Sequence, residues 1–323
     1  MTNTTDNNRD AASIISSTLA PDHGPAIAVH DGNFHADDVA GVAVVQLATG
    51  VTRLIRTRDQ EVLDASTYVL DVGGVYDPDA NRFDHHQREG KPAPRANEVP
   101  YSSFGLVWKK YGEVICGSAK VAADVDKRLV QPIDAADCGF KLFEGGRPTV
   151  NGVAHFTVSA VVSSFNPTDP DATPADFNQG FGEAVEFFRG LLCRTIDASR
   201  KKLEGEAPIR AALAAAVDKR IIELPSGGPG WDEVLCEAAE PLYVVFKAEA
   251  SSAQTWMVQC VPPEPRSFDK RRPLPETWAG LRDTELATLT GVPDAVFCHL
   301  GRFICGAGSR EGALALARLA LVA

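Results

Sequence analysis

Histidine and aspartate, side chains that often bind catalytic metal ions together, are concentrated in two short segments of this 323-residue chain. Four of the seven histidines fall in HDGNFHADD, residues 30–38, and in RFDHHQ, residues 82–87. Further aspartates stand at positions 71, 134 and 137, in VLDVGG and IDAADCG. Imidazole and carboxylate are ligands of Zn, Mn and Fe, and the open positions of such sites activate water. These segments therefore predict a metal site.

The number of these residues favours two ions over one. One histidine beside one aspartate is usually an ordinary surface pair or a hydrogen-bonded core group, but two such segments at strand ends favour metal binding. Three histidines and three aspartates suit two adjacent divalent ions that share a carboxylate, an arrangement that favours attack on a phosphate ester. In the pair Asp37-Asp38, Asp37 is the predicted ligand because it forms a His-x-Asp pair with His35. Asp38 is expected to stabilise the start of a helix.

Short apolar, β-prone runs alternate with helical patterns in the first part of the chain. Strands are predicted over 26–30, 53–58 and 67–73, and helices over 37–47 and 121–130. This alternation is typical of a parallel α/β sheet, in which functional groups collect at the carboxyl ends of the strands. Both His30 and Asp71 are expected at such ends.

A long amphipathic helix is predicted from Asp176 to about Lys202, because apolar residues recur there every three or four positions. Two further β-prone runs follow it, PLYVVFKA and TWMVQCV. The expected fold class is α/β, with a parallel-sheet metal domain over residues 25–205 joined by this helix to a smaller α/β C-terminal domain over residues 206–323. Residues 1–24 are expected to form a mobile polar arm.

Composition excludes several classes of protein. The chain has 32 Lys and Arg against 43 Asp and Glu, a net charge of −11, which argues against a broad surface for duplex nucleic acid but permits a local phosphate site. Seven cysteines without a Cys-x-x-Cys pair indicate neither a disulfide framework nor a zinc ribbon. The sequence has no secretory signal pattern and no apolar run long enough to cross a bilayer. A cytoplasmic protein without membrane contact is expected.

The order of the motifs resembles that of a known family. The chain contains, in succession, HDGNFHADD, VLDVGGVYD, RFDHHQ, SSFGLVWKKYG, IDAADCG, WMVQCVP, KRRPLPETWAGLRDTEL and FCHLGRFICGAGSREGALALA. This series looks like the melanocyte-proliferating-gene-one family of metal-dependent hydrolases, an outlying branch of the DHH phosphoesterase superfamily. The resemblance covers nearly the whole chain after the N-terminal arm. Asp84, His85 and His86 are the triplet that names the superfamily.

The resemblance implies two divalent ions and assigns their ligands. One ion would be held by His30, His35 and Asp71, and the other by Asp37, Asp71, His85 and Asp137. Asp71 would thus bridge the ions, and Asp134 remains an alternative to Asp137. By the same resemblance, His86 would face the substrate phosphate and Asp84 would orient a neighbouring imidazole. The resemblance implies Mn as the first choice of metal. His35 stands where the superfamily more often has Asp, and this softer ligand with one negative charge fewer keeps Zn and Fe open, with Mg a further alternative.

A second candidate site lies near the C-terminus, in FCHLGRFICGAGSRE, residues 297–311. Glycines, a histidine and an arginine ahead of a predicted helix could present N–H groups and positive charge to a phosphate. A tight turn between a strand and a helix would explain the same residues without a ligand. By resemblance to DHH enzymes, the segment is a substrate-binding loop with the candidate residues His299, Gly306, Gly308 and Arg310.

One dense basic segment, Arg266 to Arg272, stands in this acidic chain. Such a run is usually a solvent-exposed charged surface, and the functional alternative is contact with an oligonucleotide backbone. The resemblance implies a phosphoesterase, most closely a 3′-to-5′ exonuclease acting on RNA or short oligonucleotide ends, as a monomer or a homo-oligomer. The alternatives are a phosphatase or pyrophosphatase for small molecules and a non-catalytic, metal-stabilised regulatory protein.

Overall fold

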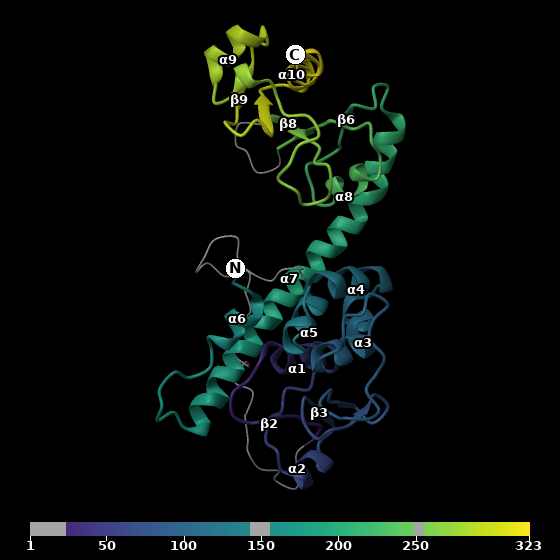
Figure 1. Cartoon of the computed structure of the whole chain (residues 1–323), viewed down its shortest axis with the longest axis vertical. Helices are drawn as coiled ribbons and strands as arrows, with labels where there is room; N and C mark the ends of the chain where they lie inside the picture. Colours follow the sequence, from purple (N-terminus) through teal and green to yellow (C-terminus); the bar gives the residue numbers. More distant parts are fainter. Residues whose placement is uncertain (1–23, 143–155, 249–254) are drawn as a thin grey trace, which may run out of the picture. The chain divides into compact units, whose positions relative to one another are not determined.

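The computed structural model describes residues 24–142, 156–248 and 255–323. The chain divides into two compact units, residues 1–197 and 198–323, and each is built on one five-stranded sheet (Figure 1). The predicted N-terminal arm lies outside the described residues, apart from residue 24. No helix in the described part of the chain is both long and apolar enough to span a membrane.

The first sheet is formed by very short, mostly buried strands. Their order is β2 (Leu54–Arg56), β1 (Ile27–Val29), β3 (Tyr68–Leu70), β5 (Arg82–Phe83) and β4 (Tyr76–Asp77). The first four strands are parallel, and β4 pairs antiparallel with β5 at the edge. The predicted parallel α/β sheet is thus confirmed for this unit.

Helices cover both faces of this sheet, because neighbouring strand residues point to opposite sides. Val69 clusters with Leu63 of α2 (Gln60–Ala65), whereas Leu70 lies beside Gly41 of α1 (Ala36–Thr49). Helix α1 packs in turn on α3 (Ser103–Cys116). Figure 1 shows α2 on one side of β2 and β3, and α1, α3 and α5 together on the other.

The helical segment predicted over 121–130 is longer and less regular than expected. It consists of α4 (Ala119–Val125), a π-helical turn (Asp126–Val130) and α5 (Gln131–Asp137). Pro132 near the start of α5 has no N–H to donate, which locally weakens the ordinary helical hydrogen-bond pattern. π-helical turns are frequent at functional sites, and this one precedes the helix that carries Asp134 and Asp137.

The long helix α7 (Pro174–Ala215) extends well beyond its predicted end near Lys202. It follows α6 (Val158–Ser163) and belongs to both units. Pro208 lies inside it without ending it, in a segment otherwise rich in the good helix formers Leu, Glu, Arg and Ala. The division between the units and the expected domain boundary after residue 205 both fall within this helix.

The second unit has a largely antiparallel sheet. The strand order is β6 (Ile221–Glu223), β7 (Tyr243–Lys247), β8 (Trp256–Cys260), β10 (Ile304–Ala307) and β9 (Ala295–Cys298), and only β6 and β7 are parallel. One face packs on α10 (Arg310–Val322), α9 (Asp283–Thr290) and the 3₁₀ turn Glu276–Trp278. The other packs on α8 (Trp231–Cys236) and the end of α7. Tyr243 faces the first of these cores and Val244 the second, as strand alternation requires.

Most of the glycine-rich loop expected over residues 297–311 is instead a β-hairpin, and its last residues begin α10. Strands β9 and β10 pair across a turn that contains His299, and Gly306 is buried within β10. A Cβ at Gly306 would lie 2.9 Å from the Phe297 ring, so close strand packing explains the glycine without a ligand. His299 and Arg310 therefore lie beyond opposite ends of β10, and the prediction that one loop contains both is wrong.

Candidate metal centre

The carboxyl ends of the parallel strands bring the predicted metal ligands together. His30 follows β1, Asp71 follows β3 and the Asp84-His85-His86 triplet follows β5. The start of α1 and the end of α5 complete the set. Among the described residues, four groups have ligand atoms within 4.8 Å of one another: His30, His35 and Asp71; Asp71, His85 and His86; His85, Asp137 and Cys138; His35, Asp37 and Asp137. All six predicted metal ligands thus belong to one overlapping cluster, which lies wholly in the first unit.

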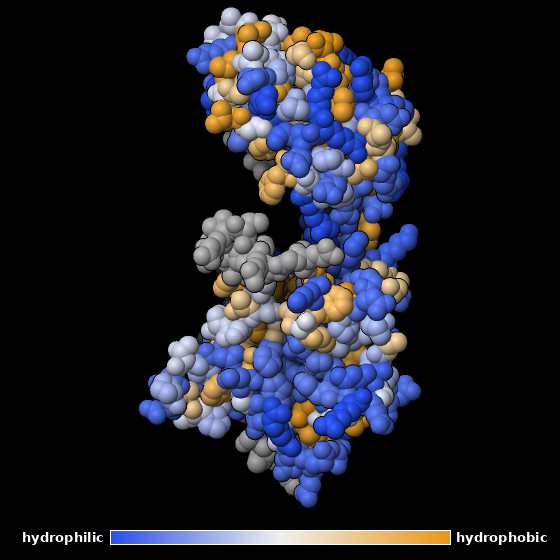
Figure 2. All heavy atoms as spheres, in the orientation of Figure 1, coloured by the Kyte–Doolittle hydropathy of each residue, from blue (hydrophilic) through white to orange (hydrophobic). Residues whose placement is uncertain are grey.

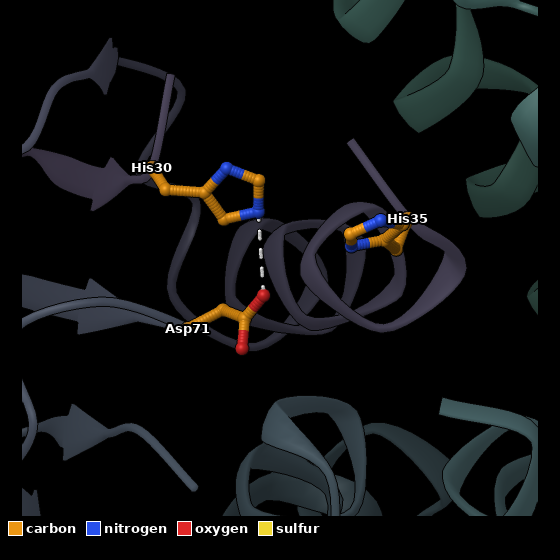
Figure 3. Close-up of side chains that lie close together, drawn as sticks. All are labelled: His30, His35 and Asp71. Atoms are coloured by element: carbon orange, nitrogen blue, oxygen red, sulfur yellow. Dashed lines mark ion pairs between the residues drawn. The ribbon is translucent and has the colours of Figure 1, made fainter. Parts of the chain in front are cut away.

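His30 and Asp71 face each other at one side of the cluster (Figure 3). The Nε2 atom of His30 lies 3.4 Å from Asp71 Oδ2, and the His35 ring at the start of α1 lies 6.0 Å from the His30 ring. The other His30 nitrogen, Nδ1, is 2.9 Å from the carbonyl oxygen of Asp31, to which it donates. This second contact fixes the ring so that Nε2 points at the carboxylates.

His85 occupies the other side, where its Nε2 atom is surrounded by carboxylates. Asp71 Oδ1 lies at 3.2 Å, Asp137 Oδ2 at 3.3 Å and Asp37 Oδ2 at 3.8 Å. Asp71 is therefore shared, with one oxygen toward His30 and the other toward His85. The shared position is the one that a bridging carboxylate would occupy.

The backbone of Asp71 is also unusual. Its φ of +57° lies in the left-handed region, and Gly73 and Gly74 follow it with φ of +91° and +68°. Asp tolerates this conformation better than most residues, yet it remains sparsely populated outside turns. The chain thus turns sharply at the end of β3 and directs the Asp71 carboxylate into the cluster.

Several polar atoms of the cluster are buried without a well-formed hydrogen bond among the described residues: both carboxylate oxygens of Asp37, Asp38 Oδ2, Asp71 Oδ1 and His85 Nε2. Their nearest polar neighbours are one another and His30 Nε2, in imidazole–carboxylate pairs at 3.1 to 3.8 Å. Buried polar groups are nearly always hydrogen-bonded, and a convergent group of carboxylate and imidazole atoms such as this one has the donor chemistry of a divalent-cation site. These residues therefore fit the metal ions that the sequence predicts.

The pKa values reflect this crowding of charge. Burial, together with Asp71 and Asp137, raises the pKa of Asp37 well above its usual range. Burial would also raise the pKa of Asp71, but the neighbouring His30 and His85 lower it to about 2. Burial would lower the pKa of His30 and of His85, but the adjacent carboxylates raise these values to about 10 and about 11. In the absence of metal, both imidazoles are protonated at neutral pH.

Asp84 holds the turn that carries the two adjacent histidines. It is buried; its Oδ2 accepts from Gly74 N, and its Oδ1 accepts from the backbone N–H of His85 and of His86. The Nδ1 atom of His86 also lies 2.8 Å from Asp84 Oδ1. Asp84 therefore orients the His86 ring and fixes its Nδ1 as the hydrogen-bonded nitrogen.

The structure separates Asp134 from Asp137, which the sequence left as alternatives. Asp134 is fully buried and pairs with Arg95 at 2.8 Å, while Ser102 and the backbone N–H of Gly105 donate to it. Its carboxylate therefore ties α5 to the start of α3 and belongs to none of the four groups. A Cβ at Gly105 would overlap this carboxylate, which explains the glycine.

Asp38 has a second contact that the sequence did not reveal. Its Oδ1 accepts from the backbone N–H of His35, as expected for a residue in the first turn of α1. Its Oδ2, however, lies 3.1 Å from His30 Nε2. Asp38 thus links the helix start to the histidine after β1.

The loop between His30 and His35 is held by residues that the sequence analysis did not single out. The Asn166 side chain accepts from the backbone N–H of Phe34 at 3.0 Å and donates to its carbonyl at 2.9 Å. Buried Arg56 donates to the carbonyl of Gly32 at 2.6 Å, and its guanidinium lies 4.6 Å from the centre of the Phe181 ring of α7. These contacts connect the backbone between the two histidines to β2, to the segment between α6 and α7, and, through Arg56, to α7.

A cavity of about 750 Å³ opens beside the cluster. Besides the predicted ligands it is lined by Lys91, Cys138, Ser159 and Ser163. Lys91 is exposed and forms no ion pair with the residues that the structure describes, and Cys138 Sγ lies 3.9 Å from His85 Nδ1. None of these four residues had a sequence signal, because each is brought to the site only by the fold.

The candidate residues of the second unit do not form a comparable cluster. Arg310 forms a bidentate ion pair with Glu223 of β6, and His299 packs on the Phe303 ring at 4.6 Å. Gly308 lies after β10, where its N–H donates to the carbonyl of Asp294. In the basic segment, Arg271 donates to the carbonyl oxygens of Ala238, Pro241 and Cys236, which gives it a structural role.

A family model named MYG1_exonuc, described as an uncharacterised protein family (UPF0160), matches residues 26–321. The chain belongs to this MYG1 family. The family resemblance of the sequence motifs is therefore confirmed. The match runs from β1 to the last helix, so it includes both units and the whole candidate metal centre.

MYG1 relatives match along nearly their full length. The protein named MYG1 exonuclease from Homo sapiens is 34% identical over 340 residues, which cover 95% of this chain and 87% of the relative. Its Rattus norvegicus counterpart is 35% identical, with 92% and 84% covered. The MYG1 protein of Saccharomyces cerevisiae is 32% identical, with 91% and 95% covered.

Proposed function

We propose that this protein is a metal-dependent phosphoesterase of the DHH type that removes nucleotides from the 3′ end of RNA or short oligonucleotides. The observation that carries the proposal is the convergence of buried carboxylate and imidazole atoms within 4.8 Å of one another, with no well-formed hydrogen bond to either Asp37 oxygen among the described residues. The relatives named MYG1 exonuclease support a nucleic-acid substrate. The charge of the chain argues for local capture of a strand end rather than binding along a duplex.

Two ions, most simply Mn²⁺, would be held by the residues of this cluster. His30, His35 and Asp71 would hold one, and Asp37, Asp71, His85 and Asp137 the other. When bound, such ions lower the pKa of water and neutralise charge on phosphoryl oxygens. The protein orients the imidazoles through the Asp31 carbonyl at His30 and holds the carboxylates in a buried site.

His86 is the proposed proton donor or charge-stabilising group for the scissile phosphate. Its side chain is 63% exposed and lines the cavity, and Asp84 engages its Nδ1 atom. That contact directs Nε2 away from Asp84 and leaves it available to a substrate oxygen. Lys91 on the same cavity wall would attract the phosphate. The cavity is in the size range of small-ligand sites, which suits one terminal nucleotide.

The direct test is hydrolysis by chelator-stripped protein reloaded with Mn²⁺, Mg²⁺ or Zn²⁺. With single-stranded RNA labelled at the 5′ end, we expect a ladder that shortens one nucleotide at a time and keeps its label. With the same RNA labelled at the 3′ end, the label should appear at once as a mononucleotide. No cleavage is expected while the chelator is in excess.

Other outcomes would contradict specific parts of the proposal. Early release of the 5′ label would reverse the direction, and cleavage inside a circular RNA would exclude an exonuclease. Hydrolysis of pyrophosphate or mononucleotides with no action on oligonucleotides would favour a small-molecule phosphatase. No hydrolysis of any of these substrates with any of the metals would favour a regulatory protein.

Asp37 provides a test of metal binding through stability. In metal-free protein its folded pKa is raised, so its contribution to stability is fully present below its unfolded pKa of about 4 and is lost as pH rises through the folded pKa. At neutral pH, D37N should therefore raise the free energy of unfolding of metal-free protein by about 1–3 kcal/mol, since it removes a buried carboxyl group whose ionisation this site disfavours. With Mn²⁺ present, the parent should instead be more stable than D37N. Denaturant unfolding with chelator and with Mn²⁺ measures the free energy of unfolding in the two conditions. D64N, which replaces an exposed carboxylate, should change neither value.

Metal binding should also release protons. The folded pKa values of His30 and His85, about 10 and about 11, mean that both imidazoles carry a proton at pH 7 that an incoming cation must displace. The apparent affinity should accordingly increase as pH rises from 6 to 9. Titration calorimetry in two buffers with different ionisation enthalpies measures the proton release. Equal heats in both buffers would show that these imidazoles are not ligands.

A further inference from the structure

The second unit contains a cavity of about 490 Å³ that the proposed hydrolysis does not use. Its lining combines residues 227–232, several residues between 259 and 270, and Phe303. It therefore includes two sequence motifs without an assigned role, the glycine-rich segment 226–230 and the first part of the basic segment. All of its residues belong to the second unit.

Two phenylalanine side chains of this cavity are open to solvent. Phe268 is 97% exposed and Phe303 is 37% exposed. A single exposed apolar side chain is ordinary, although it forgoes about 2 kcal/mol of burial. Two that line the same cavity, with the His299 ring packed on Phe303, provide apolar ring faces on which a planar group can stack.

The glycine-rich segment gives the cavity a wall of bare backbone. A Cβ at Gly227 would lie 2.4 Å from the Phe246 ring, so no side chain fits there. Gly230 has a φ of +92°, a conformation that other residues rarely adopt. Packing against Phe246 and the left-handed backbone explain these two glycines, and the segment contributes to the cavity as one of its walls.

The charged groups of the cavity are balanced and only partly engaged. Arg266 pairs with Glu233, and its backbone N–H donates to Asp232. Lys270 forms no ion pair within the part of the chain that the structure describes, and its Nζ donates to the Phe268 carbonyl at 3.4 Å. With two cations against Asp232 and Asp269, the lining can hold one phosphate at Lys270 but does not attract a long phosphate backbone.

We propose that this cavity binds one nucleotide of single-stranded nucleic acid, with the base stacked on Phe268 and Phe303 and the phosphate at Lys270. The inference rests on the proposed function, because the ligand would be part of the same substrate. Stacking on aromatic side chains accepts any base, since every base has a flat face. Paired bases do not expose these faces, so the cavity should select single strands over duplexes.

The test uses full-length protein with chelator in excess, so that no hydrolysis occurs. Fluorescence anisotropy with labelled single-stranded RNA should show binding that F268A weakens about tenfold and F268W retains. K270Q should reduce the slope of log affinity against log salt by about one. L289A is the matched control, because Leu289 is also an exposed apolar residue of this unit. Since the Phe268 side chain is exposed, its replacement should leave the thermal midpoint unchanged.

Each outcome bears on the inference separately from the proposed function. Equal affinity of F268A and the parent, equal binding of duplex and single strand, or no binding of single strands without metal would each overturn the inference. Hydrolysis of a dinucleotide with Mn²⁺ reports on the proposed function alone. Hydrolysis without Phe268-dependent binding contradicts only the inference, and Phe268-dependent binding without metal-dependent hydrolysis contradicts only the proposed function.

Discussion

Replacing Asp71 with Asn is expected to abolish metal-dependent hydrolysis while the fold remains intact. The Asp71 carboxylate is the one shared between His30 and His85, at 3.4 and 3.2 Å from their Nε2 atoms. An amide at this position would lose the negative charge and direct N–H donors at cations. Because single positioned electrostatic groups are commonly worth a hundredfold to a thousandfold, we expect turnover to fall by at least about a thousandfold when two ions are affected.

Asn is the informative substitution because it preserves the backbone. Asp71 has a φ of +57°, a conformation that Asn also tolerates, whereas Ala would add strain. Circular dichroism and thermal unfolding should therefore show a folded protein, while metal analysis should show less bound Mn²⁺. D64N serves as the control, since Asp64 is an exposed carboxylate of the same unit outside the metal cluster. Full metal content with turnover within tenfold of the parent would remove Asp71 from the mechanism.

The sheet that positions this residue could be predicted from local sequence. The runs that became β1, β2 and β3 are short and β-prone, and a helical pattern follows the first of them, so the parallel sheet and its carboxyl edge could be predicted from these patterns. The C-terminal hairpin could not be predicted in this way. Gly306 looked like part of a loop because its closest neighbours lie away from it in sequence: Phe297 of β9, Met257 of β8 and Thr255 just before β8. A glycine required by packing has the same local sequence as a glycine in a turn.

The candidate metal ligands were also easier to predict than the residues that hold them in position. His30, Asp71 and His85 were recognisable because their side chains are unusual at strand ends and recur in a fixed order. Asn166 and Arg56 hold the loop between the first two histidines through contacts across 132 and 24 positions of sequence. Lone polar residues such as these have no local pattern. Asp134 and Asp137 were indistinguishable for the same reason, since the direction of the Asp134 carboxylate depends on Arg95, Ser102 and Gly105, which are about 30 to 40 positions away in sequence.

The two adjacent histidines of the triplet should respond differently to replacement. His85 is 12% exposed and its Nε2 atom lies among three carboxylates, whereas His86 is 63% exposed and its Nδ1 atom contacts Asp84. H85A should therefore lose bound metal together with activity. H86A should keep most of its metal and still lose about a hundredfold in turnover, as expected for a general acid or a charge-stabilising group.

Asp84 provides a further control on this assignment. If Asp84 acts by orienting His86, D84N should lower turnover through the same step, and D84N combined with H86A should be little worse than H86A alone. Whether His86 binds the metal can be tested with Co²⁺-substituted protein, whose visible spectrum reports the coordination number and geometry of the ion. His86 also belongs to a group of possible ligands with Asp71 and His85. The spectrum therefore distinguishes a His86 that binds the metal from one that does not. A spectrum altered in H86A and unchanged in H85A would mean that the roles of the two imidazoles are reversed.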